Sequence, residues 1–222
     1  MKIKRGLTAF LCAALVFVML PEAVLANGTY DGLTVWGGAE GTDYSYDSGT
    51  GILTILTGTT LTLSGSTTKA KVVVQPGVTA DITLQNVSIN ISASSDCAFD
   101  TAGAVVSLTL EGTNTLKSGK GNNGSDDVGY AGIHVPVGAQ LTIGGAGSLD
   151  VTAGWVSDGK DGAGIGGDYG DNGGTVIING GTIHATSRGG AGIGGGGNGS
   201  GGTISISGGT VTATGDFGAG IG

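Results

Sequence analysis

One unit recurs near the C-terminus of this chain every 28 residues. The run Gly-Ala-Gly-Ile-Gly-Gly at 162–167 returns at 190–195 and, without its last glycine, at 218–222. Behind it, the segment 174–182 returns at the same offset as 202–210. Self-similarity at a fixed period of about 20–50 residues is the signature of a solenoid, in which each repeat buries its apolar face only by stacking on its neighbours.

Earlier segments fit the same template with looser spacing. The middle strand of each repeat reads apolar, usually hydroxyl, apolar. Because successive side chains of a strand point to opposite faces, the flanking aliphatic residues point one way and the central residue the other. Stacking then predicts an aliphatic ladder inside and a Thr-rich ladder outside. The aligned triplets are 61–63, 82–84, 108–110, 141–143, 176–178 and 204–206.

A further strand follows the middle one, aligned at 148–152, 182–186 and 210–214. Its inward residues are predicted to be Leu149, Ile183 and Val211, and its outward ladder Asp150, His184 and Thr212. Together with the Ala-Gly-Ile segment this makes three short strands per repeat, separated by glycine corners. The sequence therefore predicts an all-β parallel β-helix (β-solenoid) of about six coils, with roughly 28 residues per coil.

The glycine content supports this fold and excludes several others. Glycine supplies the positive φ that sharp corners need, but it destabilises a helix interior by about 1 kcal/mol relative to alanine. The 49 glycines in 222 residues therefore exclude an ordinary helical domain. Collagen is excluded because glycine does not recur at every third position and there are only three prolines. A hydrophobic content of 39% argues against disorder.

Residues 1–26 have the features of a signal peptide. A positive segment with Lys2, Lys4 and Arg5 precedes an apolar core at 7–20, and small residues before position 27 suit cleavage. The apolar core is shorter than the ~20 residues that a membrane-spanning helix needs. We therefore expect a secreted, extracellular chain with no transmembrane segment in its mature form.

The remainder of the chain divides into two parts. Residues 27–50 concentrate aromatic residues and do not fit the repeat, so we interpret them as an N-terminal cap over the exposed edge of the first coil. Residues 51–222 form the β-helix. Because a solenoid needs a cap at each end, we expect the natural chain to continue beyond 222, where an anchor for the cell surface or a catalytic module would lie. An uncapped end also suggests end-to-end self-association.

The charge of the chain constrains its partners. Without residues 1–26, six Lys and Arg remain against 16 Asp and Glu, a net charge of −10. Nucleic acid is disfavoured as a partner, because its affinity rests on neutralisation of phosphates by cations. The loops with Asp158 and Asp161 and with Asp168 and Asp171 follow successive turns, and converging carboxylates there would suit Ca²⁺ as a cofactor. The alternative is that aspartate beside glycine simply makes turns.

Exposed aromatic residues are the candidates for sugar binding. The face of an aromatic ring stacks on a pyranose ring while polar neighbours fix the hydroxyl groups. Trp155 and Tyr169 fall in extended loops, and Tyr130 is predicted to share their face. The alternative for Trp155 is packing at a cap or corner.

The sequence favours a protein that is not an enzyme. Arg188 is the one arginine after residue 26 and is predicted to be a surface turn residue. The adjacent carboxylates Asp126 and Asp127 lie in a polar loop, and His134 and His184 each stand alone in strands. Their spacing suits neither paired acid–base catalysis nor zinc. Cys97 is interpreted as a buried, inert thiol.

Three features together resemble a known family. They are the segment 44–55, the strand 138–143 and the repeated Gly-Ala-Gly-Ile-Gly-Gly run. The chain is similar to the secreted bacterial β-helix family of carbohydrate-binding domain-containing proteins over nearly all of its mature length. The resemblance implies a right-handed helix of the polysaccharide-lyase type that binds polysaccharide, sometimes with Ca²⁺, without a need for catalysis.

Two functions remain open. The first is a secreted or cell-surface, non-catalytic polysaccharide-binding β-solenoid, assisted by Ca²⁺ and directed at acidic glycans. The alternative is a structural stalk or adhesin segment of a bacterial surface protein with no ligand of its own. Ice binding through the Thr-rich ladder is disfavoured, because Ile177 interrupts the ladder and Asp150 and His184 make the neighbouring face irregular.

Overall fold

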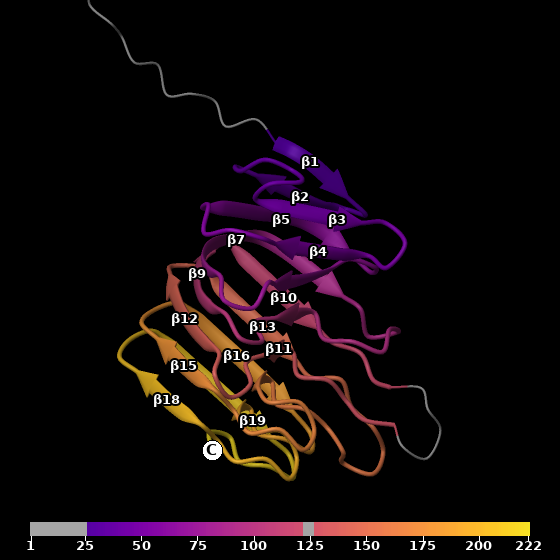
Figure 1. The fold of residues 1–222 in the computed structure, drawn as a ribbon. Coiled ribbons are helices and arrows are strands. Elements are labelled where there is room, and N and C mark those ends of the chain that lie inside the picture. Colours follow the sequence, from indigo (N-terminus) through magenta and orange to yellow (C-terminus); the bar gives the residue numbers. More distant parts are fainter. Residues whose placement is uncertain (1–25, 122–126) are drawn as a thin grey trace, which may run out of the picture.

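The computed structural model describes residues 26–121 and 127–222 and consists of β-strands joined by turns and loops. No helix occurs in these residues. The strands form one 12-stranded and one 7-stranded sheet, and Figure 1 shows them stacked from β1 at one end to β18 and β19 at the other. The predicted signal peptide lies outside the described residues, apart from Ala26.

The large sheet contains the middle and third strands of the repeat as two columns. The middle column runs through β5 (Leu61–Thr67), β7 (Thr79–Asn90), β9 (Val105–Glu111), β12 (Gln140–Gly145), β15 (Thr175–Ile178) and β18 (Thr203–Ile206). The third column runs through β10 (Thr113–Lys117), β13 (Ser148–Thr152), β16 (Thr182–Ser187) and β19 (Thr210–Gly215). Neighbouring strands within both columns are parallel.

The small sheet contains the Ala-Gly-Ile segment. Its parallel strands are β4 (Ile52–Ile55), β6 (Lys71–Val74), β8 (Phe99–Asp100), β11 (Ile133–His134), β14 (Ile165–Gly166) and β17 (Ile193–Gly194). Phe99, Ile133, Ile165 and Ile193 stack in register and are fully buried. The aliphatic ladder predicted for the middle strands is confirmed from 61–63 to 176–178, where the flanking aliphatic residues are buried, whereas in the last triplet Ile204 is half-buried and Ile206 is exposed.

The register of the last coils agrees with the prediction. Asp150 pairs with His184 and His184 with Thr212, and all three lie on the exposed face. In β12, Leu141 is buried while Thr142 is only partly buried. The parallel, all-β, repeating architecture is therefore confirmed, whereas the right-handed winding and the number of coils stay predictions.

One predicted alignment is wrong by two residues. The triplet 141–143 pairs with 106–108 rather than with 108–110. Because side chains alternate with a period of two, a two-residue shift leaves every apolar residue on the inner face, so the pattern alone does not distinguish the two registers.

The predicted coil length and strand number also hold only for the later coils. Phe99, Ile133, Ile165 and Ile193 are spaced by 34, 32 and 28 residues. In an early coil, β7 runs unbroken past the point where later coils turn between two strands. There Asn86 adopts a φ of 54°, where the next coil has Gly112 with a φ of 65°. Asparagine tolerates this conformation, so the corner carries no glycine as a sequence signal.

Antiparallel strands lie at the N-terminal end of both sheets. β1 (Ala26–Tyr30) pairs with β2 (Leu33–Trp36), and β2 pairs with β5. β3 (Tyr44–Asp47) pairs with β4 in the small sheet. The rings of Tyr30 and Tyr46 lie 5.0 Å apart, which packs the aromatic residues of this segment against each other. The boundary of the predicted cap at residue 50 stays a prediction.

Asn114 links the third column to its neighbours from a fully buried position. Its Oδ1 accepts a hydrogen bond from the Val87 N–H (2.9 Å), and its Nδ2 donates to the carbonyls of Glu111 (3.2 Å) and Ser148 (3.1 Å). We expect Asn114→Ala to lower the free energy of unfolding by about 2–3 kcal/mol, because it leaves buried polar groups without partners. Denaturant unfolding measures this loss. The exposed Asn179 is the matched control, and an equal loss in Asn179→Ala would contradict the argument.

Candidate functional site

Two adjoining pockets lie where the strands of the third column end and the chain turns into loops. One has a volume of about 340 Å³ and the other about 260 Å³. Both are lined by Thr152, Ala153 and Trp155. The first is completed by Thr186, Ser187, Arg188 and Asp216, and the second by Ser92, Lys117, Ser118, Gly119, Lys120 and Gly154.

Trp155 is the wall shared by the two pockets, and 57% of its surface is exposed. Its chain neighbours Gly154 and Val156 are buried, so the intervening side chain points outward. The guanidinium carbon of Arg188 lies 4.8 Å from the centre of the Trp155 ring and 5.4 Å from that of Phe217. This cation–π contact orients the indole, and the ring also lines the second pocket.

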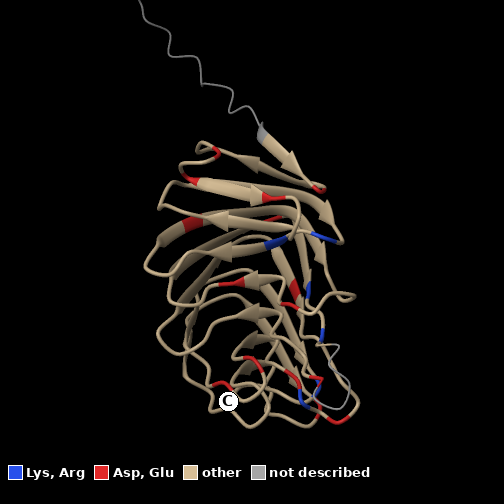
Figure 2. Cartoon of the chain, turned by 45° about the vertical axis from the view of Figure 1, so that its right-hand side comes forward, with Lys and Arg blue, Asp and Glu red and all other residues tan. Residues whose placement is uncertain are grey.

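Three cations surround Trp155. Lys117 and Lys120 line one pocket and Arg188 the other, so half of the six basic residues after position 26 lie here. The Lys120 ammonium is 4.0 Å from the Asp127 carboxylate, whereas Lys117 and Arg188 make no ion pair within the part of the chain that the structure describes. Figure 2 shows how few Lys and Arg residues the ribbon carries. We call Lys117, Lys120, Trp155 and Arg188 the Trp155 surface.

Asp161 holds the loops that carry this surface. Its side chain is fully buried and accepts hydrogen bonds from the N–H groups of Val156 (2.6 Å) and Gly189 (3.0 Å). Burial raises the pKa of its carboxyl, although both hydrogen bonds oppose the shift. Because Val156 follows Trp155 and Gly189 follows Arg188, one carboxylate fixes both sides of the stacked pair.

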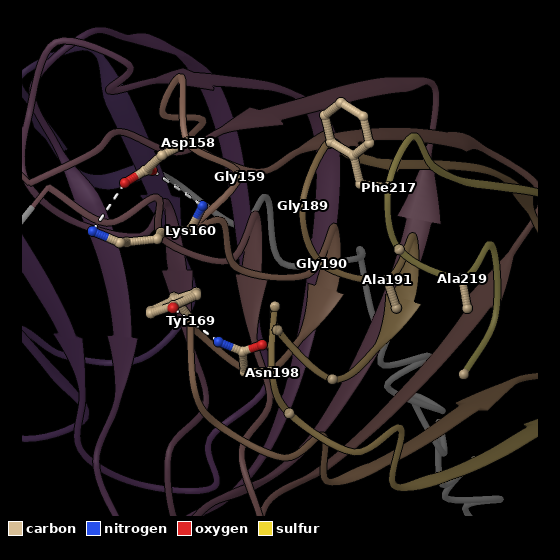
Figure 3. Close-up of a pocket in the computed structure, with 16 residues that line it drawn as sticks. Asp158, Gly159, Lys160, Tyr169, Gly189, Gly190, Ala191, Asn198, Phe217 and Ala219 are labelled. Carbon is tan, nitrogen blue, oxygen red and sulfur yellow. Dashed lines mark hydrogen bonds and ion pairs between the residues drawn. The ribbon is translucent and has the colours of Figure 1, made fainter.

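Tyr169 lies in a third pocket, drawn in Figure 3, with a volume of about 400 Å³. Its hydroxyl oxygen accepts a hydrogen bond from the Asn198 amide (2.8 Å). In the same pocket Asp158 forms an ion pair with Lys160 (2.9 Å). Tyr169 and Trp155 therefore line different pockets.

Tyr130 lies beside the loop that carries Trp155. The Gly154 N–H donates to its carbonyl oxygen (2.8 Å), while its side chain is half-buried and burial raises the pKa of its phenol. The sugar-binding roles of Trp155, Tyr169 and Tyr130 stay predictions.

The aspartates predicted to bind Ca²⁺ have different environments. The hydrogen bond from Lys160 lowers the pKa of the exposed Asp158 carboxyl. The buried Asp161 carboxylate accepts hydrogen bonds from backbone N–H groups. Asp168 accepts a hydrogen bond from the Ala131 N–H (2.6 Å), and Asp171 is exposed. Within residues 26–121 and 127–222, these four do not form a group of three converging carboxylates. Calcium binding stays a prediction.

A separate cluster joins residues that are far apart in the sequence. Potential ligand atoms of Cys97, Asp100 and His134 all lie within 4.8 Å of one another. His134 Nδ1 is 2.9 Å from Asp100 Oδ1, and His134 Nε2 is 3.9 Å from Asp168 Oδ2. The thiol is buried, as predicted for Cys97, but His134 does not stand alone.

Charge and burial act against each other in this cluster. Burial disfavours the charged form of His134, but the Asp100 and Asp168 carboxylates outweigh it and raise the imidazole pKa. Burial likewise opposes ionisation of Asp100, but the hydrogen bonds from His134 and the Ala102 N–H hold its pKa below the ordinary value. Burial raises the pKa of Asp168 and of the Cys97 thiol.

The sequence carries a signal for the Trp155 surface in the register of the third column. Thr152 pairs with Thr186 and Thr186 with Thr214. Continuing this alignment by three residues reaches Trp155, Gly189 and Phe217, so Arg188, which precedes Gly189, lies at the same corner as the two aromatic residues. The sequence has no comparable signal for the Cys97 cluster. Coils of unequal length bring its residues together, so their spacing follows no fixed period.

The stacked parallel strands define the class of the fold as a parallel β-solenoid. Residues 49–159 match the family model of carbohydrate-binding domain-containing proteins, and 176–197 and 204–222 match that of the beta helix repeat. The chain belongs to the carbohydrate-binding domain-containing protein family. No curated protein and no solved structure matches it. Within the described residues, no helix has the length and apolar character required to cross a membrane.

Proposed function

We propose that this protein is secreted, remains outside the cell or on its surface, and binds acidic polysaccharide at the Trp155 surface without catalysing a reaction. The family match supports carbohydrate as the ligand, and the composition of residues 1–26 supports export. The observation that carries the proposed site is an exposed indole, stacked by Arg188 and flanked by lysines, on a chain whose net charge is −8.

The chemistry of this surface fits a uronate-type chain. The indole supplies an apolar face for a pyranose ring, and cations on both sides of it supply partners for carboxylates. The strands below are hydrogen-bonded across successive coils, so the binding groups sit on a rigid support. Preorganised groups of this kind lose little conformational entropy on binding.

The first experiment measures retention of the protein on immobilised neutral and acidic polysaccharides, with Ca²⁺ and with chelator, while released sugar is assayed. We expect retention on the acidic polysaccharide, weakened by salt, with no sugar released. Loss of retention on chelation would support the calcium-assisted form of the proposal. A folded sample that is retained on no glycan would overturn the proposal and favour a structural stalk.

Substitution of Trp155 tests the site itself. We expect Trp155→Ala to weaken binding to the acidic glycan by about 10–50-fold, because a central aromatic anchor carries much of the binding energy at such sites. Its melting temperature should change little, since the side chain is mostly exposed. Binding isotherms measure the effect, and Val137→Ala, which truncates a side chain that is 70% exposed elsewhere, is the control. Equal affinities for both variants would place the glycan elsewhere.

Substitution of Arg188 tests how much its positive charge contributes to the affinity for acidic glycan. We expect Arg188→Gln to reduce affinity for the acidic glycan about 5–10-fold and to weaken its dependence on salt, because one cation is removed. A loss of the same size on a neutral glycan would show that Arg188 acts only by orienting the indole.

A further inference from the structure

The parallel register of the small sheet brings a metal-ligating set together. Asp100 on β8 is the Cα partner of His134 on β11. Cys97 lies three residues before Asp100, and its side chain is 3% exposed. One ligand atom from each of the three residues lies within 4.8 Å of the other two. A thiol, an imidazole and a carboxylate at this separation are the donors that a transition-metal ion uses.

A second observation concerns the far side of the imidazole ring. His134 Nε2 is buried and has no hydrogen-bond partner. The nearest carboxylate oxygen, Asp168 Oδ2, is 3.9 Å away, beyond hydrogen-bonding distance. If neutral His134 donates its Nδ1 proton to Asp100, Nε2 is a buried acceptor that faces another acceptor. An unsatisfied buried group costs about 1–3 kcal/mol, so it requires an explanation.

We propose that Cys97, Asp100 and His134 bind one divalent transition-metal ion, for which Zn²⁺ is the best fit. The ion takes the Cys97 thiolate, an Asp100 oxygen and His134 Nδ1. The ring proton then resides on Nε2 and points at Asp168, which becomes the carboxylate that orients the ligating histidine. When the metal is bound, His134 Nε2 is therefore no longer an unpartnered acceptor. It carries the ring proton and faces the Asp168 carboxylate, which can accept it.

The surroundings suit a small cation and a route for its entry. Asp100 and Asp168 have side chains that are 25% and 23% exposed, so carboxylates line the outer side while the thiol lies within. Lys71 forms an ion pair with Asp96 and so does not neutralise these two carboxylates by direct pairing. Calcium would not select this set, because it prefers oxygen ligands throughout. A polymeric substrate cannot reach so deeply buried a thiol, which disfavours Cys97 as a nucleophile.

The alternative explanation for the environment of His134 is protonation of its imidazole ring. A doubly protonated His134 between Asp100 and Asp168 would also balance the charge, without any metal. The two explanations differ in their spectra, because Co²⁺ in a site with a thiolate ligand gives a charge-transfer band in the near ultraviolet together with visible bands, whereas a protonated imidazole gives neither.

The test titrates Co²⁺ and then Zn²⁺ into the reduced full chain, made without a histidine tag and with Cys12→Ser so that Cys97 is the only thiol. We expect one Co²⁺ per chain with a thiolate charge-transfer band, displacement by one Zn²⁺ and a higher melting temperature with metal. Absence of the band from a folded chain would overturn the proposal without reference to any variant.

Two variants test the proposed ligands Cys97 and His134, and a third tests Asp168, the residue proposed to orient His134. Cys97→Ser should abolish the charge-transfer band and reduce Zn²⁺ affinity at least 100-fold, and His134→Gln should reduce affinity similarly. Asp168→Asn should reduce affinity about 10-fold with the band retained, as expected for a residue that orients a ligand. His184→Gln is the matched control, because His184 lies 4.0 Å from Asp150 in an exposed pair without a cysteine. Binding that survives in both Cys97→Ser and His134→Gln, or an equal loss in His184→Gln, would overturn the assignment.

Discussion

Gly166→Ala is expected to lower the free energy of unfolding by about 4–5 kcal/mol, at the extreme of single substitutions. Gly166 adopts a φ of 145°, a backbone conformation that residues with a Cβ avoid. A Cβ at this position would also overlap the carbonyl oxygen of Gly194 in the next coil, and Gly194 stands in the same relation to Gly222. The coils would have to separate locally for the methyl group to fit.

Two control substitutions separate steric overlap between coils from the strain of placing alanine at a positive φ. A Cβ at Gly144 meets nothing within 4 Å, so Gly144→Ala should change stability by less than about 0.5 kcal/mol. Gly170 has equal space but a φ of 85°, so Gly170→Ala should cost about 1–2 kcal/mol. Hydrogen exchange should be read together with denaturant unfolding, because repeat proteins open locally. The expected loss of unfolding free energy is largest for Gly166→Ala, smaller for Gly170→Ala and smallest for Gly144→Ala. A different order would contradict overlap between coils as the cause.

This packing explains why so much of the fold was predictable. The Gly-Ala-Gly-Ile-Gly-Gly run repeats because Gly166 and Gly194 each face the backbone of the next coil, while Ile165 and Ile193 fill the interior between them. A sequence that repeats for steric reasons shows its period directly. In the preceding coil the Cα partner of Gly166 is His134 and not a glycine. The glycine run is therefore absent there, and the sequence does not show the repeat period.

The site was less predictable for two physical reasons. Single residues such as Trp155 were recognisable by type, but their neighbours depend on which corner of which coil they occupy. The sequence predicts a surface turn for Arg188, and its stacking on Trp155, on which its proposed binding role rests, is seen only in the structure. The proximity of Cys97 and His134 depends on a coil that is longer than the 28-residue repeat, which no local spacing shows.

Asp161 illustrates the same difficulty, because the sequence suggested a calcium ligand and the structure gives it two backbone partners. We expect Asp161→Ala to lower the free energy of unfolding by about 3–4 kcal/mol, since the N–H groups of Val156 and Gly189 lose their buried acceptor. We also expect affinity for acidic polysaccharide to fall at least 10-fold, because these N–H groups fix the loops that carry Trp155 and Arg188. Calorimetric melting and binding isotherms measure the two effects.

The comparison with Asp158 decides what Asp161 does. Asp158 lies in the same loop but is exposed and pairs with Lys160, so Asp158→Ala should leave both stability and binding nearly unchanged. If Asp161 acts through its hydrogen bonds, the loss in Asp161→Ala is the same in Ca²⁺ and in chelator. If it acts as a calcium ligand, the wild type in chelator should match the variant, and Asp158→Ala should share the loss. Only the first outcome agrees with a carboxylate whose oxygens accept the Val156 and Gly189 N–H groups, and it would place the source of binding affinity in the loop that this carboxylate holds.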